Sequence, residues 1–129
     1  MAKKTVKKEK TVVCGKDHRY NGWTNYETWA LALWIDNDGE DSYWRERYVE
    51  AKDPENWAEH QREWVKKGTF TVDETAAGIL AEEMKDAFEE RMSEMLESAS
   101  VSASMWADLL GAALSEVNWN EVASHYSEE

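Results

Sequence analysis

Residues 21–39 read NGWTNYETWALALWIDNDG and carry the clearest helix signals in the chain. The stretch opens with an Asn-Gly pair, which is typical of a turn. Thr24, followed three positions later by Glu27, fits a capping box, in which each side chain accepts a hydrogen bond from the other residue's backbone amide. Gly39 closes the stretch and suits the left-handed position just after a helix. We therefore predict a helix between these two boundaries.

Apolar side chains recur along this predicted helix with the i, i+3, i+4, i+7, i+8 spacing of a single face. They are Tyr26, Trp29, Ala30, Leu33 and Trp34. Leu31 and Ile35 widen the apolar arc, so we expect this helix to be buried on most sides. The chain has eight tryptophans and only two phenylalanines, so tryptophan is expected to fill much of the core.

The chain has 129 residues, which is enough for one hydrophobic core. Hydrophobic residues make up 42% and charged residues 33%, a balance typical of a soluble globular protein. No run of apolar residues is long enough for a membrane span, and the lysine-rich start lacks a signal peptide's apolar segment. A single cysteine, Cys14, excludes an intrachain disulfide and fits a reducing compartment. We therefore expect a cytoplasmic protein.

Charge divides the chain into two parts. Residues 1–20 carry seven Lys or Arg and two acids, whereas residues 21–129 carry eight Lys or Arg and 25 acids. The sequence thus predicts a basic, flexible N-terminal arm over residues 1–20 and an acidic domain over residues 21–129. An acidic domain repels nucleic acid and favours partners with basic surfaces.

Further helix signals cover most of the remaining chain. The expected helices span roughly residues 43–52, 54–67, 73–98, 105–114 and 119–126. Residues 69–72 alternate in polarity and would pair with residues 11–14 if they formed a short strand. The predicted fold class is all-α, a compact domain of five to six helices with room for one short two-stranded element.

The predicted helix over residues 73–98 carries a row of carboxylates opposite its apolar face. This acidic row consists of Glu83, Asp86, Glu90, Glu94 and Glu97. Its simpler interpretation is a solvated helix face. The alternative is mimicry of DNA, because carboxylates at this spacing recur about every 5–6 Å, the same order as the ~3.4 Å between phosphates along one strand.

Sequence motifs for catalysis are missing. The chain has no Gly-rich phosphate loop, no HExxH and no nucleophile elbow, so we assign no catalytic residue and expect no cofactor or metal. The alternative is a small ligand-binding or enzymatic domain whose tryptophan-lined cleft involves Trp23, Asn25, Glu27 and Trp29. A third interpretation is a helical module that oligomerises through exposed tryptophans.

Two segments resemble the motifs of a small domain family found in phages, other mobile elements and some bacterial and archaeal genomes. They are NGWTNYETWALALWIDND near the start and LLGAALSEVNWNEVASH near the end, together about 35 of the 129 residues. The resemblance implies a phage or mobile-element accessory protein and supplies no catalytic residues. With the acidity, it leads us to expect a non-enzymatic protein that binds a host protein. The expected partner has a basic nucleic-acid-binding surface, which a DNA mimic would inhibit in restriction, CRISPR or another host defence.

Overall fold

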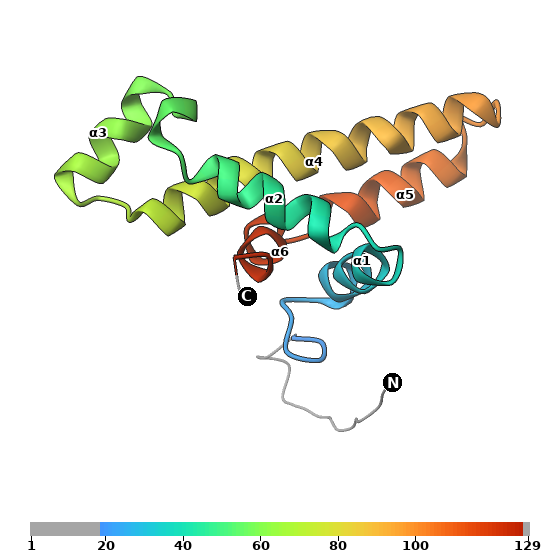
Figure 1. Cartoon of the computed structure of the whole chain (residues 1–129). Coiled ribbons are helices and arrows are strands. Elements are labelled where there is room, and N and C mark those ends of the chain that lie inside the picture. Colours follow the sequence, from blue (N-terminus) through green and yellow to red (C-terminus); the bar gives the residue numbers. More distant parts are fainter. Residues whose placement is uncertain (1–18, 128–129) are drawn as a thin grey trace.

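The computed structural model describes residues 19–127 and consists of helices joined by short connections (Figure 1). The elements are α1 (Tyr26–Asn37), α2 (Asp41–Ala51), the 3-10 turn η3 (Pro54–Asn56), α3 (Glu59–Lys67), α4 (Val72–Ser98), α5 (Met105–Ser115) and α6 (Trp119–His125). The predicted all-α fold is confirmed.

The suggested strand over residues 69–72 is not formed, because Val72 already belongs to α4. Its suggested partner, residues 11–14, lies outside the described residues, as does most of the predicted N-terminal arm. Extended pairing within residues 19–127 is limited to one bridge between Tyr20 and Trp23, which exchange two backbone hydrogen bonds of 2.7 and 2.8 Å. The predicted Asn-Gly turn closes this bridge, with both residues at positive φ.

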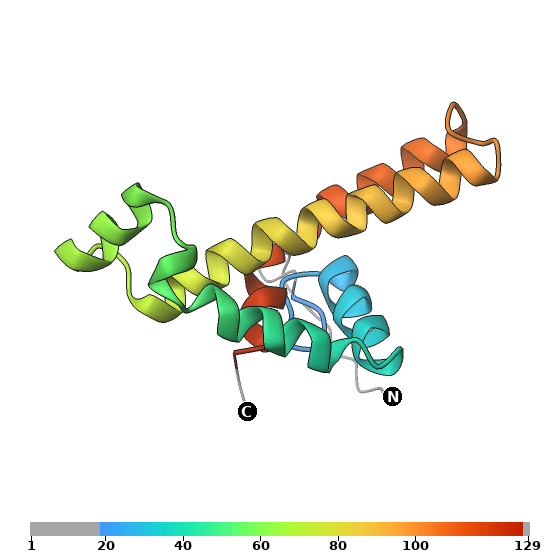
Figure 2. The same cartoon turned by 45° about the horizontal axis from the view of Figure 1, so that its top comes forward.

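Helix α4 organises the core. Its first half packs against α6 on one side and α2 on another (Figures 1 and 2). The central side chains are buried to within a few per cent and come from all three helices: Trp44, Leu80, Met84, Val122 and Tyr126. The Tyr126 hydroxyl donates to Asp36 at 3.0 Å, which ties α6 to α1. Burial, and then the nearby Asp36 carboxylate, raise the pKa of Tyr126.

Helix α1 buries a different face from the predicted one. Thr28, Ala32 and Ile35 are buried, whereas Tyr26 and Trp34 remain 54% and 62% exposed. The observed inner face is two residues out of phase with the predicted one, a rotation of about 200° around the helix. Only one side of α1 is buried, so the prediction of burial on most sides was wrong.

Local signals predict some helix boundaries correctly and fail at the start of the third predicted helix. Thr71 and Glu74 form the expected capping box of α4, and Gly68 ends α3 at φ +83°. Asp53-Pro54, expected to open the third helix, opens only η3, and α3 begins at Glu59. The break has a physical cause at Trp57, which is extended and buried. Its indole N–H donates to the Ala51 carbonyl at 2.7 Å.

The second half of α4 extends beyond the body of the molecule. Residues 87–98, the connection 99–104 and α5 form a projecting pair of antiparallel helices, here called the α4–α5 hairpin (Figures 1 and 2). Leu96 is buried within it, whereas α5 contains no buried residue. The fold thus places α3 at one end of the molecule and the hairpin at the other (Figure 1).

Candidate interaction surfaces

The two sequence motifs meet where the N-termini of α1 and α6 lie side by side. Asn25 caps α1 by accepting from the Thr28 amide at 2.9 Å, and Asn118 caps α6 by accepting from the Glu121 amide at 3.1 Å. Each cap also forms a hydrogen bond with the segment that precedes the other helix. Asn25 Nδ2 donates to the Glu116 carbonyl at 2.7 Å, and Asn118 Nδ2 donates to Thr24 Oγ1 at 3.0 Å.

Thr28 lies at the centre of this arrangement and is fully buried. Its hydroxyl donates to Asn25 Oδ1 at 2.6 Å and accepts from the Asn118 amide at 2.9 Å. Glu121 completes the set by accepting from the Thr24 amide at 2.9 Å. We call these residues (Thr24, Asn25, Thr28, Asn118 and Glu121) the clasp. Its long-range hydrogen bonds join residues 90 to 97 positions apart, so the clasp connects the two ends of the domain.

The predicted capping box of Thr24 and Glu27 is therefore wrong. The cap of α1 is Asn25, one position later, and the Thr24 amide bonds Glu121 from α6. Thr24 and Glu27 have the sequence spacing of a capping box. In the structure, however, the Thr24 amide donates to Glu121 of α6 instead of to Glu27.

The four residues of the alternative cleft make separate contacts. Asn25 uses both its oxygen and its nitrogen in the clasp. Trp23 packs edge-on to His125 with 5.3 Å between ring centroids, whereas Trp29 packs against Tyr20 at 5.0 Å. Glu27 is half-buried on the first turn of α1. These contacts account for Trp23, Asn25 and Trp29 as parts of the fold.

The acidic row lies on α4 as predicted, but its first member differs from the rest. Glu83 accepts from Arg47 Nε at 2.7 Å and is 31% exposed. That hydrogen bond raises the pKa of Arg47. The other four members (Asp86, Glu90, Glu94 and Glu97) are exposed, and none has an ion-pair partner within residues 19–127. The acidic surface available to a partner is therefore this group of four.

The acidic row faces away from α5. Glu94 is two residues from both Met92 and Leu96, and two residues correspond to a rotation of about 200° around a helix. Because Leu96 is buried against the rest of the hairpin, Glu94 and its neighbours point to the opposite side.

Helix α5 presents an apolar surface that the sequence did not single out. Eight of its eleven residues are apolar, yet none is buried. Met105, Trp106 and Leu109 are 60%, 62% and 56% exposed, and together they form what we call the α5 face. A helix that is apolar around most of its circumference is normally covered by other protein. The only hint in the sequence was the low charge of this segment, whose single ionisable side chain is Asp108.

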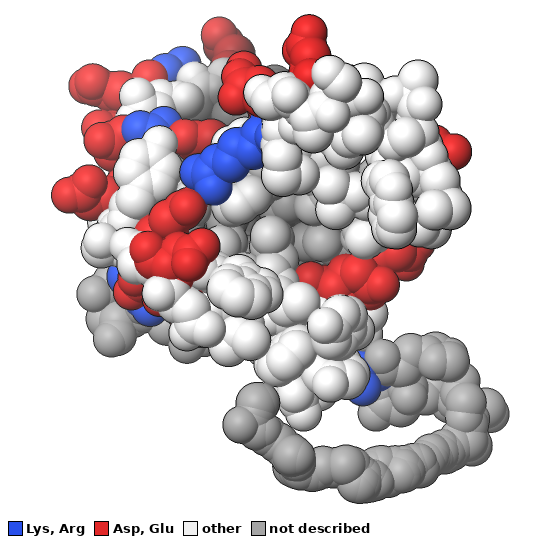
Figure 3. Space-filling view, turned by 90° about the vertical axis from the view of Figure 1, so that its right-hand side faces the viewer, with Lys and Arg blue, Asp and Glu red and all other residues white. Residues whose placement is uncertain are grey.

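Figure 3 views the molecule from the end that carries the α4–α5 connection. Acidic side chains crowd the left and upper edges of this view and form a further group right of the centre, whereas uncharged surface fills the upper right and the area below a central hollow. Acidic side chains thus border the uncharged surface on this end of the molecule. A charged border around an uncharged surface is typical of an interaction site.

Among residues 19–127, no three His, Cys, Asp or Glu side chains gather into a set that could hold a metal ion. No helix in the same range combines the length and apolarity needed to cross a bilayer.

These features define a small all-α domain with a clasped body and a projecting two-helix hairpin. A family model matches residues 16–129, and the chain belongs to that family, a family of unknown function designated DUF7249. No curated protein and no solved structure matches the chain.

Proposed function

We propose that this protein is a non-enzymatic binding module that engages a protein partner through the α4–α5 hairpin. The observation that carries the proposal is α5, whose residues are mostly apolar and of which none is buried. Contiguous apolar surfaces of this kind on soluble proteins mark interaction sites. The hairpin presents its helix face beyond the body, in the manner of a helix that enters a groove (Figure 1).

Burial of the α5 face alone would not provide enough free energy for a stable complex. Covering its three large side chains would contribute roughly 5 kcal/mol, at about 1.5–3 kcal/mol for each fully buried side chain. Association costs about 4–15 kcal/mol in lost freedom. The α5 face therefore acts as an anchor, and a stable complex needs further contacts. Met95, which is 57% exposed on the same half of α4, can extend the apolar area.

The charge around the hairpin defines the chemistry of the partner. Asp108 is exposed on α5, and four unpaired acids of the acidic row lie on the reverse side of α4. A matching surface is an apolar groove of helix width with Lys or Arg at its rim. A narrower version of the proposal takes the partner to be a host nucleic-acid-handling protein, inhibited by a phage or mobile-element accessory protein that imitates DNA charge. The net charge of −12 supports this version.

Site-specific photo-crosslinking tests the proposal. A photoreactive amino acid replaces Trp106 in the full chain, or Val49 on α2 as a control that is equally exposed at 62%. We expect crosslinks to another protein from position 106 and not from position 49. Leu109→Ser should reduce the yield from position 106, because it removes the neighbouring apolar contact. The proposal is wrong if the two positions give the same products, or if position 106 crosslinks only to a second copy of this chain.

Charge exchange tests the narrower version against the partner so identified. One variant changes Asp86, Glu90, Glu94 and Glu97 to lysine, and a matched control changes four exposed acids elsewhere: Glu46, Glu55, Glu59 and Glu63. DNA mimicry predicts that duplex DNA competes with the protein and that only the first variant loses binding, with a steep dependence on salt. If both variants lose binding equally, the overall negative charge of the domain explains the binding, and the proposal of DNA mimicry is wrong.

A further inference from the structure

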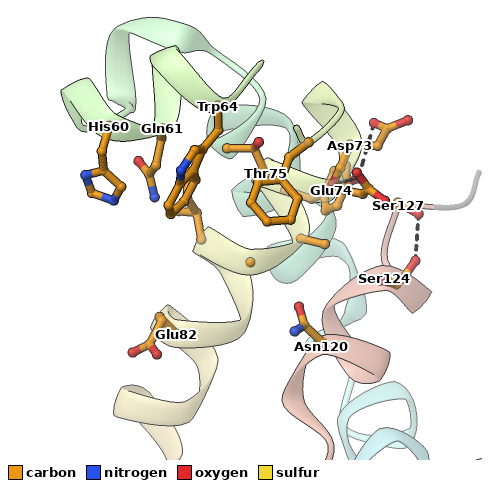
Figure 4. Close-up of a pocket in the computed structure, with 15 residues that line it drawn as sticks. His60, Gln61, Trp64, Asp73, Glu74, Thr75, Glu82, Asn120, Ser124 and Ser127 are labelled. Atoms are coloured by element: carbon orange, nitrogen blue, oxygen red, sulfur yellow. Dashed lines mark hydrogen bonds between the residues drawn. The ribbon is translucent and has the colours of Figure 1, made fainter. Parts of the chain in front are cut away.

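A pocket lies at the end of the molecule opposite the α4–α5 hairpin. It is bounded by α3, the first turns of α4 and the C-terminal part of α6, and it has a volume of about 780 Å³ (Figure 4). This volume is within the range of small-molecule sites, about 300–1,000 Å³. The proposed partner surface does not use any of its lining residues.

One wall of the pocket is aromatic. The Trp64 ring packs edge-on to His60 on one side, with 4.7 Å between centroids, and to Phe70 on the other, with 5.1 Å. Trp64 and Phe70 remain 39% and 40% exposed, although both are large aromatic side chains. The π-electron face of tryptophan is the strongest of the aromatic rings in attracting cations.

The charge of the lining has one sign. Asp73, Glu74 and Glu82 contribute carboxylates, and neither lysine nor arginine is present among the lining residues. Asp73 accepts from the Tyr48 hydroxyl at 3.2 Å, and Glu74 accepts from the Thr71 amide at 2.9 Å. Glu82 is exposed and makes no ion pair within residues 19–127. The pocket thus contains a carboxylate without a compensating positive charge.

Thr75 adds an unsatisfied polar group to the same wall. It is only 6% exposed, and its hydroxyl is without a hydrogen-bond partner. Figure 4 shows Thr75 between Trp64 on one side and Asp73 and Glu74 on the other. An unpaired buried hydroxyl costs about 1–3 kcal/mol in stability. A ligand N–H would satisfy this hydroxyl after a rotation of the threonine side chain, whereas an aliphatic ligand would not.

From these four features we infer that the pocket binds an organic cation, an ammonium or guanidinium group on an apolar stem. The Trp64 ring faces the cation, Glu82 neutralises its charge, and Thr75 accepts one of its N–H groups. The stem occupies the apolar remainder of the pocket, which Ile79 and Phe70 help to line. Such a group occurs on free diamines and on the lysine or arginine side chains of peptides.

Binding is tested on the full chain by titration with cadaverine, with Nα-acetyl-lysine amide, and with pentanol as a neutral control. Proton–nitrogen NMR spectra follow the tryptophan indole signals, and Trp64→Leu identifies the signal of Trp64. We expect the Trp64 signal to shift with at least one of the two amines and to remain in place with pentanol. A response to cadaverine alone indicates a free amine, and a response to the lysine derivative indicates a peptide side chain.

Matched carboxylate variants separate a specific site from general acidity. Glu82→Gln lies in the pocket, whereas Glu90→Gln removes one exposed, unpaired carboxylate from the same helix far from it. We expect about tenfold weaker binding for Glu82→Gln and for Trp64→Leu, and unchanged binding for Glu90→Gln. Thr75→Val should raise the melting temperature of the free protein and weaken amine binding. The inference is overturned if Glu82→Gln and Glu90→Gln have equal effects, or if pentanol binds as well as the amines.

Discussion

Replacing Asn25 with aspartate separates the capping of α1 from the clasp that joins α1 to α6. Asp and Asn are equally good N-caps, and a carboxylate is favoured at a helix N-terminus. In the clasp, however, Asn25 Nδ2 donates to the Glu116 carbonyl at 2.7 Å. A carboxylate at that position cannot donate and places an oxygen against the carbonyl oxygen. Asn25→Asp should therefore destabilise the domain although the cap is retained.

The magnitude follows from the individual bonds. Asn25→Asp loses one hydrogen bond of about 1 kcal/mol, adds repulsion between two acceptors, and regains about 0.3–1 kcal/mol from the helix dipole, for a net loss of roughly 1 kcal/mol. Asn25→Ala loses the cap, about 1 kcal/mol, and the hydrogen bond to the Glu116 carbonyl, again about 1 kcal/mol. It also leaves the Thr28 hydroxyl without its acceptor, and because Thr28 is fully buried, this loss adds about 1–2 kcal/mol. We expect a total of roughly 3–4 kcal/mol for Asn25→Ala.

Urea unfolding followed by circular dichroism measures these differences as free energies of unfolding. Thr71→Asp is the control, because Thr71 caps α4 at an exposed site and its hydroxyl contacts only the Glu74 amide there. That variant should have the stability of the wild type to within about 0.5 kcal/mol. If Asn25→Asp is also as stable as the wild type, the hydrogen bond from Asn25 to the Glu116 carbonyl contributes nothing to stability, and a role for Asn25 beyond capping α1 is refuted.

Two further predictions concern stability. Burial raises the pKa of Tyr126 and of Tyr48 above the ordinary value of 10.0. The contribution of each tyrosine to the free energy of unfolding is therefore complete below about pH 10 and is lost as the pH rises further, by up to ~1.4 kcal/mol per pH unit. In alkaline denaturation, stability should fall less steeply with pH for Tyr126→Phe than for the wild type, and an unchanged slope would contradict this prediction. Gly68 has φ +83°, so Gly68→Ala should lower the free energy of unfolding by about 1 kcal/mol. Gly78 lies within α4 with nothing within 4 Å of an added Cβ, so Gly78→Ala should raise it by up to about 1 kcal/mol. Thermal melts should show shifts of the melting temperature in opposite directions for the two variants.

Helix positions could be predicted from the sequence because they depend on local signals. The apolar spacing of residues 73–98 and the Thr71–Glu74 capping box predicted α4 almost to its boundaries. The buried face of α1 could not be predicted in the same way. Large apolar residues occur on its predicted inner face, yet the inner face is set by Thr28 and its bonds to Asn118. That partner is 90 residues away, and no local pattern contains it.

The candidate surfaces show the same division. The acidic row was predictable because its members recur at helical spacing. The ion pair between Glu83 and Arg47, which removes Glu83 from the surface available to a partner, depends on how α2 packs against α4 and was not predictable. The α5 face was missed for the opposite reason. Its apolar pattern predicted a helix, and a helix that is apolar around most of its circumference normally has buried residues. Only the fold shows that no residue of α5 is buried.

The uncovered α5 face gives the acidity of the domain a physical explanation that does not depend on DNA. Met105, Trp106 and Leu109 would promote association between copies of the chain if nothing opposed it. A net charge of −12 makes such copies repel each other and so opposes their association. The unpaired acids of the hairpin lie on the side of α4 away from this face, where they add repulsion without covering the apolar surface. A partner of the proposed kind, with a basic rim, would remove that repulsion as it covers α5, so the charges that oppose self-association would favour the proposed complex.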